Sequence, residues 1–179
     1  MRIGYSGAIK LAINDFHKHD RLPDAIQYLQ ALLAKLKLTN PQRTLDAEYT
    51  LQGYTEWFAS ERPIVAASKA RIELDLGNKI ILGGEVSRVD VTVADDGYRG
   101  VLLSDADDPQ WMDRLRMPLL QRALARKFER DERDVVVGVQ RLDGSGLMTH
   151  YYSPRSIKGA EVEARTLAQT ISGLLTNES

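Results

Sequence analysis

The sequence predicts an α/β domain in which a mixed sheet is flanked by helices and the N-terminal third is helical. Three observations predict it. Apolar residues repeat at helical spacing up to about residue 60, and the pattern then switches to alternation. A helix, two further strands and a last helix follow the alternating segment. We expect one domain over 1–179, with a helical part over 1–60 and a sheet-containing core over 61–179.

Three helices are predicted in the N-terminal third. The first covers about residues 6–19, where apolar residues form a stripe on one side. A second helix begins at Pro23 and carries a leucine-rich stripe. Asn40 followed by Pro41 is typical of a helix N-cap and first turn, so a third helix starts there. Pro63 forbids its continuation.

The middle of the chain predicts an antiparallel meander of three strands. Apolar and charged residues alternate over 72–76, which is typical of a half-buried strand. The pair Gly77–Asn78 predicts a tight hairpin turn into a second strand over 80–93. A second turn at 95–97 then leads to a third strand over 98–103.

A helix and two strands are predicted after the meander. Asp108–Pro109 predicts a helix start, and the helical stretch runs to about Arg130. Pro118 lies inside it, so the helix is expected to kink or restart there. The segments 134–141 and 147–152 are predicted to return to the sheet.

The last helix is predicted to start at about Gly159. Its apolar residues recur every three or four positions, which is the spacing of one helix face. We expect the whole of this face to be buried against the rest of the domain. It consists of Ala164, Leu167, Ala168, Ile171, Leu174 and Leu175.

Composition excludes several classes of protein. A formal net charge of -1 gives no overall attraction to nucleic acid, so any such contact would need a local patch. The absence of cysteine excludes disulfides, thiolate zinc sites and iron–sulfur clusters. No apolar run approaches the roughly 20 residues of a membrane span. We therefore expect a cytoplasmic protein with no membrane partner.

Three segments resemble motifs of a known nuclease family. Residues 84–90 read Gly-Glu-Val-Ser-Arg-Val-Asp, residues 101–106 read Val-Leu-Leu-Ser-Asp-Ala, and residues 113–120 open the following helix. Together with the element order, they resemble the RecB-like branch of the PD-(D/E)XK nucleases. The resemblance implies a restriction-endonuclease-like sheet, in which an antiparallel meander is joined by return strands.

The positions that carry the family's chemistry depart from its pattern. The resemblance places the first metal-binding Asp at Ser87, the second acid at Ser104 and the lysine at Ala106. Serine is a weak neutral ligand and alanine is none, so Mg²⁺ or Mn²⁺ loses its carboxylate ligands. Three further family positions have also changed, and they are occupied by Lys10, Arg116 and Leu120.

The expected function is therefore non-catalytic, with no catalytic residues, metal or cofactor. The inherited surface would bind DNA, or dock a helicase or nuclease partner, in DNA repair, recombination or phage defence. One alternative is a divergent nuclease whose Mg²⁺ or Mn²⁺ site has moved to Asp90, Asp105 and Asp107. Strand alternation speaks against the first of these, because Asp90 should face away from Ser87. Another alternative is a structural interaction protein without nucleic acid.

A row of arginines is the candidate nucleic-acid surface. Arg122, Arg126 and Arg130 recur every four residues and share one helix face, where they could follow a phosphate backbone. The competing interpretation is a solvated face that pairs with its own acids. Arg116 is the fourth candidate DNA contact. His17 and His19 are expected at the surface, and Trp57 and Trp111 in the core.

Overall fold

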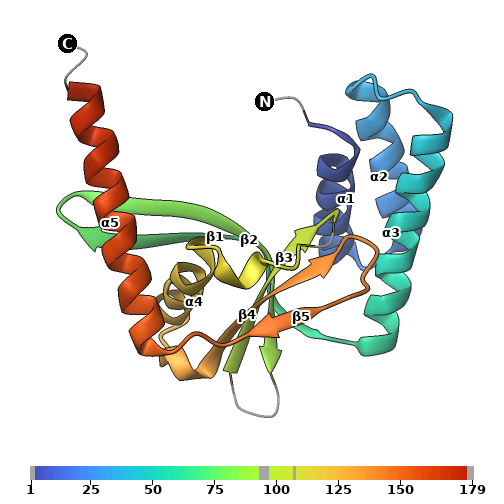
Figure 1. The fold of residues 1–179 in the computed structure, drawn as a ribbon. Helices are drawn as coiled ribbons and strands as arrows, with labels where there is room; N and C mark the ends of the chain where they lie inside the picture. Colours follow the sequence, from blue (N-terminus) through green and yellow to red (C-terminus); the bar gives the residue numbers. More distant parts are fainter. Residues whose placement is uncertain (1–2, 93–96, 107, 177–179) are drawn as a thin grey trace.

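The computed structural model describes residues 3–92, 97–106 and 108–176 of the chain. Five strands form one mixed sheet in the order β1-β2-β3-β4-β5, with helices on both sides (Figure 1). Three helices precede the sheet, so the predicted α/β class and the helical N-terminal third are confirmed. Within the described residues, no helix is long and apolar enough to cross a membrane.

The three N-terminal helices form a bundle on one side of the sheet. They are α1 (Tyr5–His19), α2 (Leu22–Lys35) and α3 (Pro41–Glu61). As predicted, Asn40 caps α3, and its side chain accepts a hydrogen bond from the Arg43 amide at 3.0 Å. Apolar side chains of the bundle form one buried cluster that also includes Leu103 of the sheet.

The meander consists of β1 (Ile64–Gly77), β2 (Ile80–Thr92) and β3 (Gly97–Ser104), all paired antiparallel. The predicted hairpin turn is present, with Gly77 at φ 81°. Residues 93–96 of the second predicted turn lie outside the described part of the chain, and Gly97 opens β3.

β1 begins eight residues before the predicted strand start at residue 72. The strand changes face near its middle, so alternation did not reveal its first half. Ala67 and Ala70 both pack into the cluster around α4, although they are three positions apart, and Lys69 between them has φ 49°. On β2, Val86 and Val89 pack into the same cluster with the same separation.

The predicted helix over 108–130 is in fact a 3-10 turn (Trp111–Asp113) followed by α4 (Arg116–Lys127). Asp108 does not cap a helix by its side chain, because that carboxylate pairs with Arg114 at 2.8 Å. Pro118 is the third residue of α4. The first-turn amides of a helix have no partner within the helix, so proline is tolerated there.

β4 (Val135–Arg141) returns parallel to β3, and the short β5 (Met148–His150) pairs with β4. α5 (Pro154–Thr176) starts five residues earlier than predicted. Ser153 sets this start, because its Oγ accepts the amide of Ser156 at 3.2 Å ahead of a first-turn proline.

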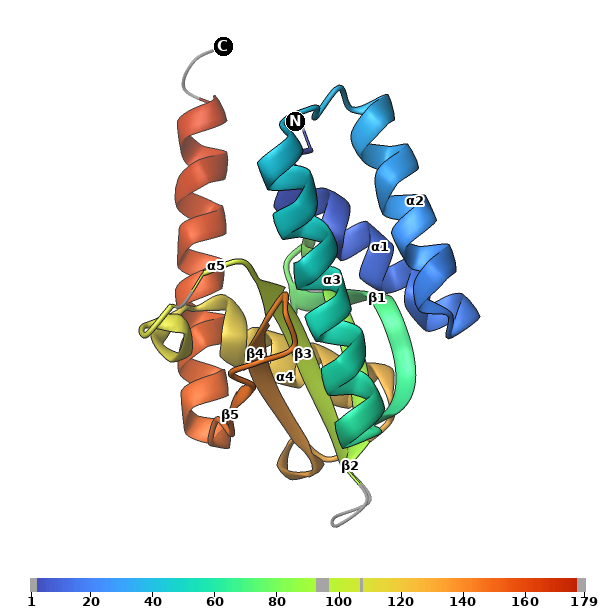
Figure 2. The same cartoon turned by 90° about the vertical axis from the view of Figure 1, so that its right-hand side faces the viewer.

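The two faces of the sheet bury different kinds of side chain. α4 lies behind the sheet and α3 in front of it in Figure 2. The α4 face is apolar, and α4 packs so closely on β3 that a Cβ at Gly100 would collide with Leu124. The face toward the N-terminal bundle carries buried charges. The candidate site lies on that face and at the strand ends beside it.

Candidate functional site

Ser87, the expected first metal-ligand position, lies where β2 stops pairing with β3. The ladder between the two strands runs as far as Arg88, which is opposite Val101. Beyond that point the Leu103 amide donates to Ser87 Oγ at 3.1 Å. The hydroxyl therefore supplies a main-chain hydrogen bond that strand pairing no longer supplies.

Ser104 and Ala106, the other two changed positions, form a tight local turn at the end of β3. Ser104 Oγ donates to the Ala106 carbonyl at 2.8 Å and also accepts the Ala106 amide at 3.3 Å. Short polar side chains make such turns with their own backbone. The two serines are thus bonded to the main chain.

Asp105 lies between these two positions and points toward α1. Its carboxylate accepts a hydrogen bond from Ser6 Oγ at 2.6 Å. This bond, together with the charge of Lys10, holds the pKa of Asp105 below its usual value. The start of α1 therefore adjoins the end of β3, with Lys10 near Asp105.

Two of the three candidates for a relocated metal site, Asp90 and Asp105, have different structural roles. Asp90 is fully buried and paired with arginines, whereas Asp105 is exposed and bonded to Ser6. Asp107 lies outside the described residues. Among the residues that the structure covers, no three His, Asp or Glu side chains come together to hold a metal ion.

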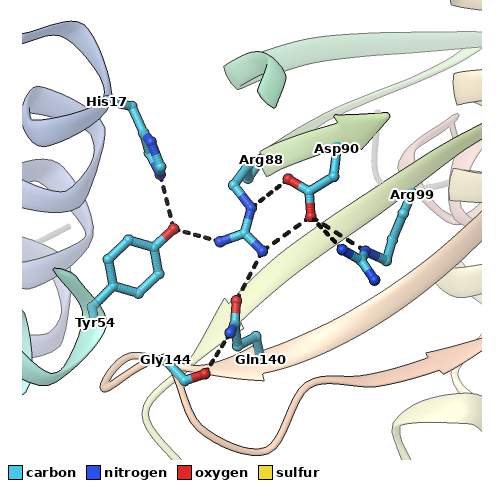
Figure 3. Close-up of polar contacts among 7 residues, drawn as sticks. All are labelled: His17, Tyr54, Arg88, Asp90, Arg99, Gln140 and Gly144. Carbon is cyan, nitrogen blue, oxygen red and sulfur yellow. Dashed lines mark hydrogen bonds and ion pairs between the residues drawn. The ribbon is translucent and has the colours of Figure 1, made fainter. Parts of the chain in front are cut away.

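Arg88 and Asp90 form the centre of a buried polar network on the bundle side of β2 (Figure 3). Arg88 donates Nε to Asp90 Oδ1 at 2.6 Å and Nη2 to Oδ2 at 3.1 Å, a bidentate pair. Arg99 of β3 adds a second cation, with Nη2 at 3.1 Å from Asp90 Oδ2. Both Arg88 and Asp90 have no exposed surface.

The network continues from Arg88 into β4. Arg88 Nη2 donates to Gln140 Oε1 at 3.0 Å, and Gln140 Nε2 donates to the Gly144 carbonyl at 2.5 Å. The guanidinium also lies 4.7 Å from the centre of the Trp57 ring, within cation–π range. Each polar atom of the Arg88 head therefore has a partner, as burial requires.

The network also reaches the bundle through Tyr54 of α3 and His17 of α1. Arg88 Nη1 donates to Tyr54 Oη at 2.5 Å, and Tyr54 Oη lies 2.8 Å from His17 Nε2. The tyrosine oxygen accepts from Arg88, and its own proton can be donated to His17 when Nε2 carries no hydrogen. Burial, helped by the charge of Arg88, lowers the pKa of His17 to about 4.

Sequence reasoning missed this network. His17 was expected at the surface, and that prediction is wrong because Tyr54 and Phe58 cover its ring. Trp111 is buried as predicted, whereas Trp57 is half-buried under Arg88. Arg88 and Asp90 lie two residues apart on one strand and so share a face, which is the one sequence feature that could have indicated this pair.

The predicted arginine row is engaged with the protein itself. Arg122 pairs with Glu132 at 3.2 Å and with Glu161 at 2.8 Å. Arg126 Nη1 donates to the Asp75 carbonyl of edge strand β1 at 3.1 Å, and Arg130 lies 5.9 Å from the Tyr98 ring. Three successive members of the row thus contact groups of this chain.

Arg116 and Leu120 border a second feature, a shallow groove of about 380 Å³ between β2 and α4. The groove has a mainly apolar lining, with Glu85 on its strand side. A larger cleft of about 480 Å³ lies between α1, α3 and the end of β3. It mixes both signs of charge, from Arg43, Arg141, Asp46, Asp105 and Asp143.

Comparison with protein-family models finds no match, and a search of curated proteins finds no match either.

Proposed function

We propose that this chain is a catalytically inactive domain of the RecB-like nuclease type, which docks a partner protein in DNA repair, recombination or phage defence. One observation carries the proposal: the Ser87 hydroxyl accepts the Leu103 amide where the resemblance expects a metal-binding carboxylate. The element order and the proximity of Lys10 to Asp105 agree with the same layout.

The lost groups are the ones that a metal-dependent nuclease needs. Phosphodiester hydrolysis requires a hard cation held by carboxylates, which lowers the pKa of the attacking water. A nearby lysine then stabilises the developing negative charge. Ser87, Ser104 and Ala106 supply neither charge, and Asp90 is paired with Arg88 and Arg99.

Protein docking is better supported than DNA binding as the use of the inherited surface. A phosphate-binding arginine needs a guanidinium that faces solvent. Arg122 is instead mostly buried between Glu132 and Glu161, and Arg126 donates to a carbonyl of β1. Arg116, Arg126 and Arg130 are exposed, so DNA binding through these three arginines is one of the outcomes that the experiment below distinguishes.

The decisive experiment restores the missing groups. The triple variant Ser87→Asp, Ser104→Glu and Ala106→Lys should bind Mn²⁺ in calorimetric titration, while the wild type gives no binding heat. The matched control Ser87→Asn, Ser104→Gln and Ala106→Lys has the same shape without the carboxylates, so it should not bind. Circular dichroism establishes that each variant is folded.

Two outcomes would contradict the proposal. A folded triple variant that binds no metal would remove support for the nuclease layout and favour a structural interaction protein. A wild type that binds Mn²⁺, and loses it on Asp105→Ala, would favour the divergent nuclease. DNA affinity with a steep salt dependence that Arg116→Glu and Arg126→Glu reduce would replace docking by DNA binding.

A further inference from the structure

The apolar stripe of α5 is only half covered. Its members Ile157, Ala160, Ala164, Leu167 and Ile171 follow one another at spacings of three and four residues. The first three are buried, and the two alanines pack with α4 and the β1–β2 hairpin. The same stripe continues along the helix beyond them without a change of phase.

The cover ends at the tip of the hairpin. Arg165 Nε donates to the Leu76 carbonyl of β1 at 2.5 Å. Beyond it, Leu167 is 49% exposed and Ile171 is 57% exposed. Both views show the C-terminal half of α5 extending past the hairpin, with no other described element beside it (Figures 1 and 2).

The charge pattern of α5 changes at the same place. Residues 154–165 include five charged residues, whereas residues 166–176 include none. Across the whole chain 27% of residues are charged, so an uncharged stretch of this length on a protruding helix is unusual. Such a surface can form no ion pairs with a charged partner, and it does not repel another uncharged surface.

We propose that a second copy of this chain covers the exposed stripe with its own α5. A spacing of three and four residues is the spacing of helices that pack against one another along a seam. A two-fold contact brings the same surface of both copies together, and an uncharged stripe can meet its own copy without like-charge repulsion. Within one chain, α1–α3 lie on the far side of the sheet from this helix (Figure 1). This inference rests on α5 alone and does not depend on the proposed function.

The test measures self-association by sedimentation equilibrium over a concentration series. The wild type should form a dimer, and Leu167→Glu with Ile171→Glu should weaken its association at least about 100-fold, because two carboxylates would be buried at the seam. The matched control is Val162→Glu. Val162 is 54% exposed on the same helix but faces away from the stripe, so the dimer should persist.

The absence of cysteine allows a second, independent measurement. A short bismaleimide should cross-link Ala168→Cys, which lies beside the stripe, and should not cross-link Val162→Cys. A wild type that stays monomeric throughout the series would overturn the proposal. A dimer that Leu167→Glu and Ile171→Glu leave intact, or equal cross-linking of both cysteine variants, would also overturn it. Because the substituted residues are exposed within one chain, circular dichroism should show every variant folded, and the double glutamate variant should lose only the stabilisation that dimerisation supplies.

Discussion

Two neighbouring positions of β2 differ in charge. Arg88 and Asp90 keep a full ion pair in a fully buried position, whereas Ser87, one residue away, is neutral at the position where the resemblance expects a carboxylate. The difference follows from what each charge needs. Carboxylates that converge without a metal ion repel one another, so neutral side chains at such positions avoid that repulsion. A buried pair cannot lose one partner without leaving an uncompensated charge.

The largest expected effect is that of Asp90→Asn. It leaves Arg88 buried beside a neutral amide and removes the counter-charge of Arg99, so the free energy of unfolding should fall by about 3–5 kcal/mol. Urea denaturation measures the loss. Asp105→Asn is the control, because this exposed carboxylate mainly accepts one bond from Ser6, and its loss should cost less than about 1 kcal/mol. Equal costs would contradict the contrast between the two regions.

The sequence predicted the α/β class and the meander because local periodicity determines them. The strands of residues 80–92 and 97–104 lie close to the predicted ranges. Where the pattern is local but irregular, prediction failed. The face change at Lys69 concealed the first half of β1, and the last helix was expected to bury a stripe that ends in solvent at Leu167 and Ile171.

The polar network was beyond sequence reasoning for a different reason. His17 meets Tyr54 across 37 positions, and Arg88 meets Gln140 across 52. No periodicity or spacing links residues that far apart, and each looks like an ordinary surface residue when taken alone. The resemblance singled out Ser87, Ser104 and Ala106 within two short segments, but the hydrogen bond between Ser87 and the Leu103 amide could not be predicted from the sequence.

The second prediction uses pH to act on the buried region alone. The pKa of His17 is 6.5 in an unfolded chain and about 4 in the folded one, mainly because of burial and then because of Arg88. The folded value is the lower one, so the unfolded chain binds more protons between these two limits. Stability is therefore present above about pH 6.5 and is lost as pH falls toward about 4.

Between about pH 7 and about pH 5, this single group should cost about 2 kcal/mol of unfolding free energy. The check compares the wild type with His17→Gln, whose side-chain oxygen can still accept the Tyr54 proton. The carboxylates contribute equally to the pH dependence of stability in both proteins. The difference between the two pH profiles therefore isolates the contribution of His17. Profiles that run parallel would mean that His17 is accessible and charged in the folded protein.

Ser87→Ala is expected to have the smallest effect. It tests whether the Ser87 hydroxyl has a structural role. Removing the hydroxyl leaves the half-buried Leu103 amide without its partner, so unfolding free energy should fall by about 1 kcal/mol. Ser104→Ala removes only a local turn bond at an accessible strand end and should cost less than about 0.5 kcal/mol. Two equal and negligible losses would show that Ser87 has no structural task. The strand junction would then tolerate any small residue there. A clear loss at Ser87 alone would mean that its hydroxyl holds the two strands together where their pairing ends.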